Sequence, residues 1–154
     1  MYYQSEKGEI FMKQLLIVDD QQGIRLLLNE VFKREGYTTY LAANGIEALE
    51  LAERIKFDGV LLDMKIPGMD GIEILKRIKS RTPDVPVLMI TAYGELDLIK
   101  EAMDLGASHY FTKPFDIYEV RDAVNGMLKD WKKQAVANTA CFCYHLKEKW
   151  KSPL

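Results

Sequence analysis

The sequence predicts an α/β fold in which a doubly wound, five-stranded parallel sheet carries helices on both faces. Short apolar runs alternate with longer stretches whose apolar residues recur at helical spacing, and this alternation occurs five times. Several of the runs are β-branched or aliphatic throughout, which is typical of strands buried on both faces. Strands and helices that alternate in this way favour a parallel sheet with right-handed crossovers.

Each expected element follows from its own local pattern. The expected strands are residues 15–18, 38–42, 60–62, 85–90 and 110–111, and the expected helices are residues 24–32, 46–55, 72–78, 96–105 and 120–131. Asp70 and Glu73 have the spacing of a capping box at the start of the third helix. Gly106 follows the fourth helix, at the position where a glycine commonly ends a helix.

The length and composition fit a single domain with its own core. The chain has 154 residues, of which 48% are apolar and 29% charged, and its formal net charge is -2. A nucleic-acid-binding protein would normally show a basic excess, and no apolar run approaches the roughly 18 residues of a membrane span. The N-terminus lacks the apolar segment of a secretory signal, and two cysteines give no disulfide framework. We therefore expect a cytoplasmic protein that binds neither nucleic acid nor membrane.

The expected domain covers residues 13–133, and the segments on either side of it carry weaker signals. Residues 1–12 form a short polar extension, within which Met12 is an alternative start. Residues 134–154 are expected to extend the last helix, to be disordered or to be an added sequence; a helical tail could pair with a second subunit. Cys141, Cys143 and His145 are soft metal ligands, but a structural zinc site needs four ligands and no fourth is evident.

Five polar residues are expected at one edge of the sheet. Asp19 and Asp20 follow the first strand, Asp63 follows the third, Thr91 follows the fourth, and Lys113 lies at the end of the fifth. The carboxyl ends of the strands are where ligands bind in sheets of this kind. Each residue alone is readily explained as a helix cap or a turn residue. Their joint occurrence, in order, on four strands favours a common site.

The chemistry of these residues indicates phosphoryl transfer. Three carboxylates beside one ammonium leave a net negative charge in a small space, and a hard cation such as Mg²⁺ would neutralise it. Asp63 can act as the nucleophile without a general base, because an aspartate with an ordinary pKa of about 3.9 is ionised at neutral pH. A phosphoryl group on Asp63 would be shared by the cation, Lys113 and Thr91.

Four motifs together resemble one family. Leu-Leu-Ile-Val-Asp-Asp at 15–20, Leu-Leu-Asp-Met-Lys-Ile-Pro-Gly-Met-Asp-Gly at 61–71, Ile-Thr-Ala at 90–92 and Lys-Pro-Phe at 113–115 are similar to the receiver domains of two-component response regulators. The resemblance covers about residues 13 to 131. It implies a flavodoxin-like (βα)5 receiver fold with strand order 2-1-3-4-5.

The resemblance implies a role for each residue at the sheet edge. Asp63 matches the phosphoacceptor, and Thr91 and Lys113 match the catalytic hydroxyl and lysine that contact the phosphoryl group. Asp19 and Asp20 match the acidic pair that holds Mg²⁺ together with Asp63, with Mn²⁺ or Ca²⁺ as substitutes. Asp20 is the direct ligand of that pair. The backbone carbonyl of Lys65 matches the remaining protein ligand.

Further positions of the family concern switching and hydrolysis. Thr91 and Tyr110 match the two switch positions, although Tyr110 replaces the histidine expected at this position in single-domain phosphorelay intermediates. The bond between Lys113 and Pro114 is expected to be cis. Lys65 and Tyr93, two residues after Asp63 and Thr91, match positions that control water access, so we expect their bulky side chains to slow dephosphorylation.

Four longer segments are more narrowly similar to single-domain phosphorelay intermediates of spore-forming bacteria: residues 20–32, 64–77, 91–97 and 113–117. This similarity implies a Mg²⁺-dependent aspartyl phosphotransferase of a sporulation-type phosphorelay. It would accept a phosphoryl group from a sensor histidine kinase and pass it to a histidine phosphotransferase with a four-helix bundle. An aspartyl-phosphate phosphatase is a further partner that the similarity allows.

The first expected helix carries more apolar residues than one buried stripe needs. Six of the nine residues in 24–32 are apolar, whereas a surface helix normally uses three or four in about two turns. One interpretation is a broad contact with the sheet. The other, which the resemblance favours, leaves apolar residues beside the site to bind a partner helix. That surface would comprise Gln21, Gly23, Ile24, Leu27, Pro114 and Phe115.

Two other functions compete with the phosphorelay interpretation. A non-transferring signalling receiver, similar to those of chemotaxis, would bind a target protein when phosphorylated and never pass the phosphoryl group onward. A fragment of a transcription factor is disfavoured, because the sequence has neither a helix-turn-helix pattern nor a basic excess.

Overall fold

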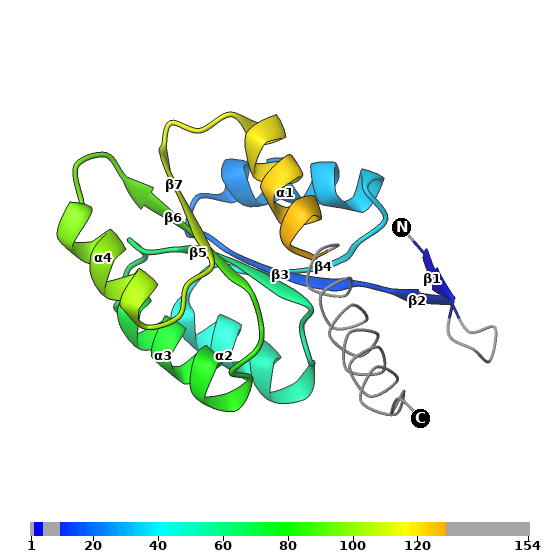
Figure 1. Cartoon of the computed structure of the whole chain (residues 1–154), viewed down its shortest axis with the longest axis horizontal. Helices are drawn as coiled ribbons and strands as arrows, with labels where there is room; N and C mark the ends of the chain where they lie inside the picture. The colour runs from blue at the N-terminus through cyan, green and yellow to red at the C-terminus, as the bar shows by residue number, and fades with distance from the viewer. Residues whose placement is uncertain (1, 5–9, 129–154) are drawn as a thin grey trace, which may run out of the picture.

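The computed structural model describes residues 2–4 and 10–128, and it contains the predicted parallel sheet (Figure 1). The strands of this sheet are β3 (Gln14–Val18), β4 (Thr38–Ala42), β5 (Gly59–Asp63), β6 (Val87–Ala92) and β7 (His109–Lys113). They are ordered β4-β3-β5-β6-β7, and every pairing between them is parallel. Counted from β3, this is the order 2-1-3-4-5, so the predicted doubly wound fold is confirmed.

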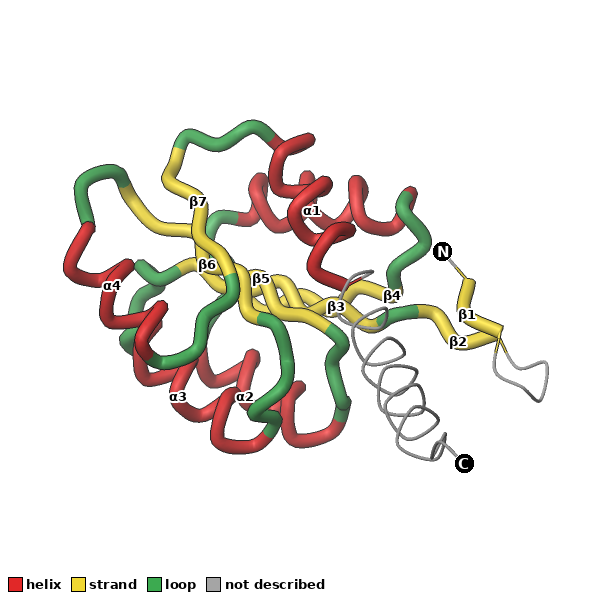
Figure 2. The backbone as a smooth tube through the Cα atoms, viewed as in Figure 1, coloured by secondary structure: helices red, strands yellow, loops and turns green. Residues whose placement is uncertain are grey.

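Helices cover both faces of the sheet, as predicted. They are α1 (Gln22–Arg34), α2 (Gly45–Arg54), α3 (Gly71–Arg81), α4 (Leu96–Asp104) and a last helical segment over residues 117–128. Figure 2 shows α1 and the last segment on one face, with α2, α3 and α4 on the other. Among the described residues, no helix combines the length and the apolar character that a membrane crossing requires.

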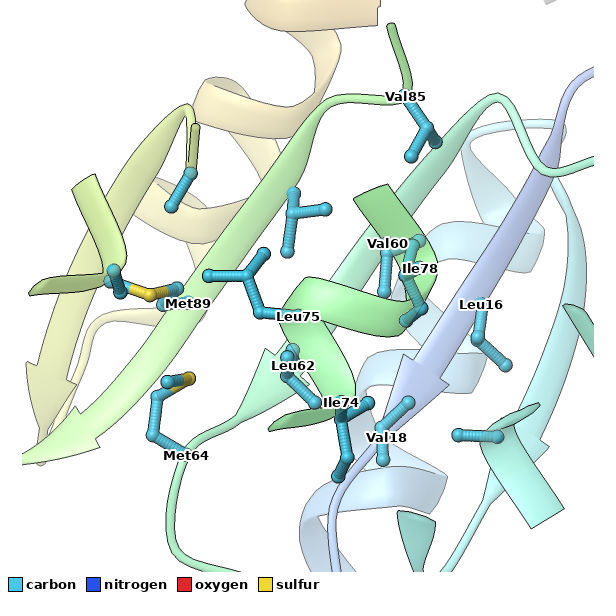
Figure 3. Close-up of a cluster of buried hydrophobic side chains, with 14 of the residues drawn as sticks. Leu16, Val18, Val60, Leu62, Met64, Ile74, Leu75, Ile78, Val85 and Met89 are labelled. Carbon is cyan, nitrogen blue, oxygen red and sulfur yellow. The ribbon is translucent and has the colours of Figure 1, made fainter. Parts of the chain in front are cut away.

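The central strands are buried on both faces, which explains their aliphatic composition. Leu16 and Val18 of β3 enter the core cluster beneath α2, α3 and α4, whereas Leu15 and Ile17 enter the cluster beneath α1 and residues 117–128. Figure 3 shows the first cluster, where side chains of α3 lie over those of β3, β5 and β6. Burying one such side chain stabilises the fold by roughly 1.5–3 kcal/mol, so the two cores hold the sheet edge in a fixed arrangement.

Two strands, β6 and β7, differ by two residues at an end from their predicted bounds, whereas the other strands agree to within one residue. β6 begins at Val87 rather than at residue 85, because Pro86 has no N–H to donate to a neighbouring strand. The N–H of Val85 instead donates to the carbonyl of Thr82 in the preceding turn (3.2 Å). β7 has five residues rather than two, because its backbone pairs with β6 from His109 to Lys113 although polar residues flank the short apolar run on which the prediction was based.

The predicted end of α4 is confirmed, and it has a specific geometry. Gly106 has a φ of 98°, a left-handed value that a residue with a Cβ adopts only at a cost. Its N–H donates to the carbonyl of Met103 (3.1 Å), and the N–H of Ala107 donates to the carbonyl of Ala102 (3.0 Å). This pair of hydrogen bonds is a Schellman motif, which satisfies carbonyls at the end of the helix.

Helix starts were predicted less completely. Asp70 caps α3 as expected by accepting from the N–H of Ile72 (3.1 Å), but Glu73 pairs with Arg77 one turn further on rather than reaching back. The reciprocal pattern occurs instead at α2, where Asn44 accepts from the N–H of Glu47 (2.9 Å) and the Glu47 carboxylate accepts from the N–H of the residue before Asn44 (2.8 Å). Asn44 and Glu47 have the same three-residue spacing, so this cap was also visible in the sequence.

The N-terminal extension contains structure that the sequence analysis did not predict. β1 (Tyr2–Gln4) and β2 (Ile10–Met12) form an antiparallel pair separate from the main sheet. Two short runs with aromatic and β-branched residues, separated by a segment containing a glycine, are a hairpin signal, and it was overlooked. The tail at 134–154 with its Cys141, Cys143 and His145, like the end of the predicted domain at residue 133, lies outside the described residues.

Candidate functional site

The strand register brings the predicted polar residues to one edge of the sheet. Val18 is paired with Leu62, so the acidic residues after β3 lie next to the end of β5. Asp63 is paired with Ile90, which places Thr91 one residue beyond it on β6. Lys113 is paired with Ala92, at the same edge of the sheet.

Three carboxylates form a cluster at this edge. One oxygen from each of Asp19, Asp20 and Asp63 can be chosen so that all three lie within 4.8 Å of one another. Asp19 and Asp63 are almost completely buried, at 1% and 2% exposed, whereas Asp20 is exposed. Carboxylate oxygens are the ligands that Mg²⁺ prefers, so this group could hold a metal with Asp20 facing the solvent from which the ion would arrive.

Lys113 is the counter-charge of the two buried carboxylates. Its Nζ lies 2.9 Å from Asp63 Oδ2 and 3.2 Å from Asp19 Oδ2. The other oxygen of each carboxylate accepts a backbone hydrogen bond: Asp19 Oδ1 from Gln21 (2.8 Å) and Asp63 Oδ1 from Lys65 (2.9 Å). The predicted convergence of acids and amine is therefore present, and every oxygen of the two buried carboxylates has a donor.

Burial and hydrogen bonding act in opposite directions on the pKa of Asp63. Burial raises the pKa of Asp63 above its ordinary value, and the neighbouring Asp19 carboxylate adds to the rise. Hydrogen bonds from Lys113 and from the N–H of Lys65 lower the pKa but do not cancel the effect of burial. For Lys113, burial lowers the pKa, but the Asp63 and Asp19 carboxylates outweigh it and the pKa is raised. Lys113 therefore stays charged.

Backbone geometry holds the loops that carry these residues. The peptide bond between Lys113 and Pro114 is cis, as the resemblance implied. Arg25 of α1 donates from Nη1 to the backbone carbonyl of Asp19 (2.7 Å). A Cβ on Gly71 would lie 2.6 Å from the Cα of Met64 and 2.7 Å from its carbonyl oxygen. Only glycine permits this close approach, which packs the start of α3 against the backbone just after Asp63.

Thr91 takes part in a second network, which the sequence analysis missed. Its fully buried hydroxyl donates to Oε2 of Glu95 (2.6 Å), and Oε1 of Glu95 forms an ion pair with Nζ of Lys65. The pKa of Glu95 is lowered by its hydrogen bonds with Lys65 and Thr91. Glu95 follows Thr91 by four residues in a loop, where no local pattern marks a glutamate as part of the site.

The remaining predicted site residues lie farther toward solvent. Tyr110 of β7 is 42% exposed, and Tyr93 in the loop after β6 is 88% exposed, so the Tyr93 side chain does not cover the carboxylates in this structure. Lys65 is also exposed at its side chain, at 62%. The roles predicted for these three residues remain predictions.

The predicted partner surface is partly apolar and exposed. Leu27 on α1 is 49% exposed, and the neighbouring Leu26, which was not predicted, is 51% exposed. Ile24 and Phe115 are half-buried against the core cluster under α1, so they offer only part of their surface. Pro114 is exposed, as are the two polar or small residues predicted beside it, Gln21 and Gly23.

The fold and the sheet-edge residues define a class of protein. Residues 15–125 match the response regulator receiver domain family, which is well over half of the chain. The chain therefore belongs to the response regulator receiver domain family, and the resemblance seen in the four motifs is confirmed.

The chain covers nearly the whole of some relatives and only part of others. The chain is 60% identical over 116 residues to sporulation initiation phosphotransferase F of Bacillus subtilis (strain 168), an alignment that covers 75% of this chain and 94% of that protein. It is 40% identical over 118 residues to the regulatory protein AtoC of Escherichia coli (strain K12), covering 77% of this chain but 26% of AtoC. A CheY-like receiver domain from Methanospirillum hungatei JF-1 superposes with a TM-score of 0.77 and 29% identity, covering 80% of this chain and 99% of that one.

The raised pKa of Asp63 gives a pH-dependent prediction for Asp63→Asn. A carboxyl group whose pKa is higher in the folded than in the unfolded state favours folding when protonated, and this contribution is lost as pH rises through the folded pKa. Without a divalent cation, Asp63→Asn should therefore have a larger free energy of unfolding than the wild type at pH 7, and the difference should shrink as pH falls through the raised pKa of Asp63 and vanish below the ordinary aspartate pKa. Urea unfolding in EDTA at several pH values measures it. If Asp63→Asn were less stable than the wild type at pH 7, the hydrogen bonds from Lys113 and Lys65 would outweigh the cost of burying the Asp63 charge, contrary to the raised pKa.

Proposed function

We propose that this chain is a phosphoryl carrier of a phosphorelay. It accepts a phosphoryl group from the phosphohistidine of a sensor kinase onto Asp63 and passes it to a histidine on a four-helix-bundle phosphotransferase. The single observation that carries the proposal is the buried Asp63 carboxylate, held 2.9 Å from Lys113 Nζ within a cluster of three acids. The 60% identity over nearly the whole of sporulation initiation phosphotransferase F supports the narrower part, the sporulation-type relay.

In the first step, an oxygen of Asp63 attacks the phosphorus of the donor phosphohistidine. A new O–P bond forms while the N–P bond breaks, and its electron pair stays on the imidazole nitrogen. In the second step, a neutral imidazole nitrogen of the acceptor attacks the same phosphorus, and the O–P bond to Asp63 breaks. Neither step needs a general base, because an aspartate and a neutral imidazole are already nucleophilic at neutral pH.

The surrounding residues stabilise charge on the phosphoryl group. Lys113 contacts Asp63 already, so its ammonium can follow an oxygen of the phosphoryl group without a large movement. Thr91 supplies a hydroxyl from the adjacent strand. A bound Mg²⁺ supplies further charge neutralisation, and Asp19, Asp20, Asp63 and the carbonyl of Lys65 are the groups proposed to hold it. Fixed donors around a developing charge are the main source of catalysis in phosphoryl transfer.

The partner surface is proposed to lie beside the site. Leu27, with Ile24 and Pro114 and their neighbours Gln21, Gly23 and Phe115, borders the sheet edge on the side of α1. An apolar surface at this place suits a partner helix that presents a histidine to Asp63. The domain that carries out this function is proposed to span residues 13–133, and a phosphatase acting on phosphorylated Asp63 would use the same access route.

The proposal is tested by transfer in both directions. With Mg²⁺ and a phosphorylated sensor kinase, the wild type should become phosphorylated, and the label should move to a histidine phosphotransferase and back again. Asp63→Asn should abolish labelling, since it removes the nucleophile. Lys113→Ala should reduce transfer by about two orders of magnitude or more, the usual scale for losing one charge-stabilising group.

The same experiment separates the alternative function. A receiver that only signals would be labelled on Asp63 but would release phosphate to water rather than to the acceptor histidine. If Asp63→Asn were labelled as well as the wild type, phosphorylation would not depend on Asp63, and this result would contradict both interpretations.

The docking surface makes a separate prediction for Leu27→Ala. Truncating a half-exposed leucine in a contact surface should slow transfer to the histidine phosphotransferase about tenfold, the scale of a moderate interface residue. Labelling by a small phosphodonor such as acetyl phosphate should not change, because a small molecule does not need the docking surface. Ile46→Ala is the matched control, since Ile46 is exposed on α2 (63%) but lies outside the proposed surface. Equal effects of the two substitutions would argue against docking at α1.

The proposed control of hydrolysis by Lys65 predicts that Lys65→Asn loses its phosphoryl group faster than the wild type. The long side chain of Lys65 is held beside the site by its ion pair with Glu95, where it restricts the approach of water to the acyl phosphate. A shorter side chain should shorten the half-life of the phosphorylated protein severalfold. The measurement is the loss of ³²P label after the donor is removed, with Lys76→Asn, an exposed lysine of α3, as control. A half-life that is unchanged or longer would contradict this role.

A further inference from the structure

Glu95 uses both of its carboxylate oxygens on groups that belong to the proposed phosphoryl site. Oε2 accepts from the hydroxyl of Thr91 at 2.6 Å, and Oε1 pairs with Nζ of Lys65. The Glu95 side chain is 20% exposed and Thr91 is fully buried, so their hydrogen bond is largely shielded from water. A charge-assisted hydrogen bond in such a place is strong.

Glu95 could satisfy a different set of groups. It is the N-cap residue of α4, a position from which a side-chain oxygen can accept from the backbone N–H groups of the first turn. Here the Glu95 side chain forms no such cap hydrogen bond. The carboxylate therefore faces the sheet edge rather than the helix to which it belongs.

The Thr91 hydroxyl can serve only one acceptor at a time. A threonine hydroxyl has a single proton to donate, and in this structure that proton is committed to Glu95. A phosphoryl group has only acceptor oxygens, so it can gain a hydrogen bond from Thr91 only after the bond to Glu95 breaks. The two acceptors are mutually exclusive.

We propose that Glu95 is a positioning residue that competes with the phosphoryl group on Asp63 for the hydroxyl of Thr91. In the unphosphorylated protein, Glu95 holds Thr91 and Lys65 together at the sheet edge. Phosphorylation draws the Thr91 hydroxyl away and releases the Glu95 carboxylate, which is then free to cap the first turn of α4. This inference rests on the proposed function, since it concerns the regulation of the same site.

The test measures how tightly the site binds a phosphoryl mimic. Beryllofluoride is titrated by calorimetry into the full chain with saturating Mg²⁺, for the wild type, Glu95→Ala and Glu95→Gln. Removing the competing acceptor should tighten binding to Glu95→Ala about tenfold, which corresponds to about 1.4 kcal/mol. Glu95→Gln should lie between the two, because its neutral amide oxygen still accepts from Thr91, but more weakly. Thermal melting confirms that each variant is folded.

A double-mutant cycle separates this role from a general effect of charge. Glu101→Ala removes an exposed glutamate from the same helix, and it should change the affinity by less than about twofold. In a Thr91→Val background, Glu95→Ala should likewise have an effect below about twofold, because the hydroxyl for which Glu95 competes is gone.

The outcomes distinguish the inference from the proposed function. If Glu95→Ala leaves the affinity for beryllofluoride unchanged or weakens it, Glu95 does not act by competing for Thr91. The same conclusion follows if Glu95→Ala tightens binding equally in the wild type and in the Thr91→Val background. In either case the wild type still binds beryllofluoride, and the carrier function stands. If the wild type itself fails to bind beryllofluoride with Mg²⁺, the proposed function fails, and the role of Glu95 fails with it.

Discussion

The site depends on the burial of two like charges beside one opposite charge. Asp19 and Asp63 are almost inaccessible to water, and the Lys113 ammonium is within 3.2 Å of both. One ammonium cannot neutralise two carboxylates with a third, Asp20, close by. The arrangement therefore retains negative charge at the sheet edge, and it is the fold that holds these groups together against their repulsion.

The fold can hold this charge because its strands are anchored from both sides. Alternate residues of β3, β5 and β6 enter two separate apolar cores, so a shift in register by one residue would move every side chain into the opposite core and disrupt the packing of both. The carboxyl ends of these strands consequently have little freedom. The contact between Gly71 and the backbone of Met64 extends the same constraint into the loop after Asp63, which keeps the nucleophile in place while its surroundings change protonation or ligand.

The site combines a rigid part with a part that has alternative partners. Asp19 and Asp63 lie at the ends of buried strands and Lys113 at the end of the edge strand β7, and the carboxylates accept from the backbone and from Lys113. Glu95, at the start of α4, instead binds Thr91 and Lys65 through side-chain contacts. When a phosphoryl group arrives, the Asp63 oxygen that it binds is already fixed, but the Thr91 hydroxyl that would donate to it is hydrogen-bonded to Glu95. Occupancy of the site is thereby linked to the start of a surface helix.

The sequence by itself determined both helical layers and the residues at the strand ends through local periodicity, and it determined the strand order through the resemblance of its contiguous motifs to a known family. It also located the glycine that ends α4. The β1–β2 pair was not predicted although its hairpin signal is present in the sequence, and the start of β6 was wrong because Pro86 displaces the strand. Only the tertiary structure decided that Lys113 bridges two carboxylates and that Glu95 engages Thr91 and Lys65. The physical reason is that side-chain partners are set by register, burial and rotamer, which bring together residues 30 or more positions apart, such as Lys65 and Glu95, without leaving any pattern between them in the sequence.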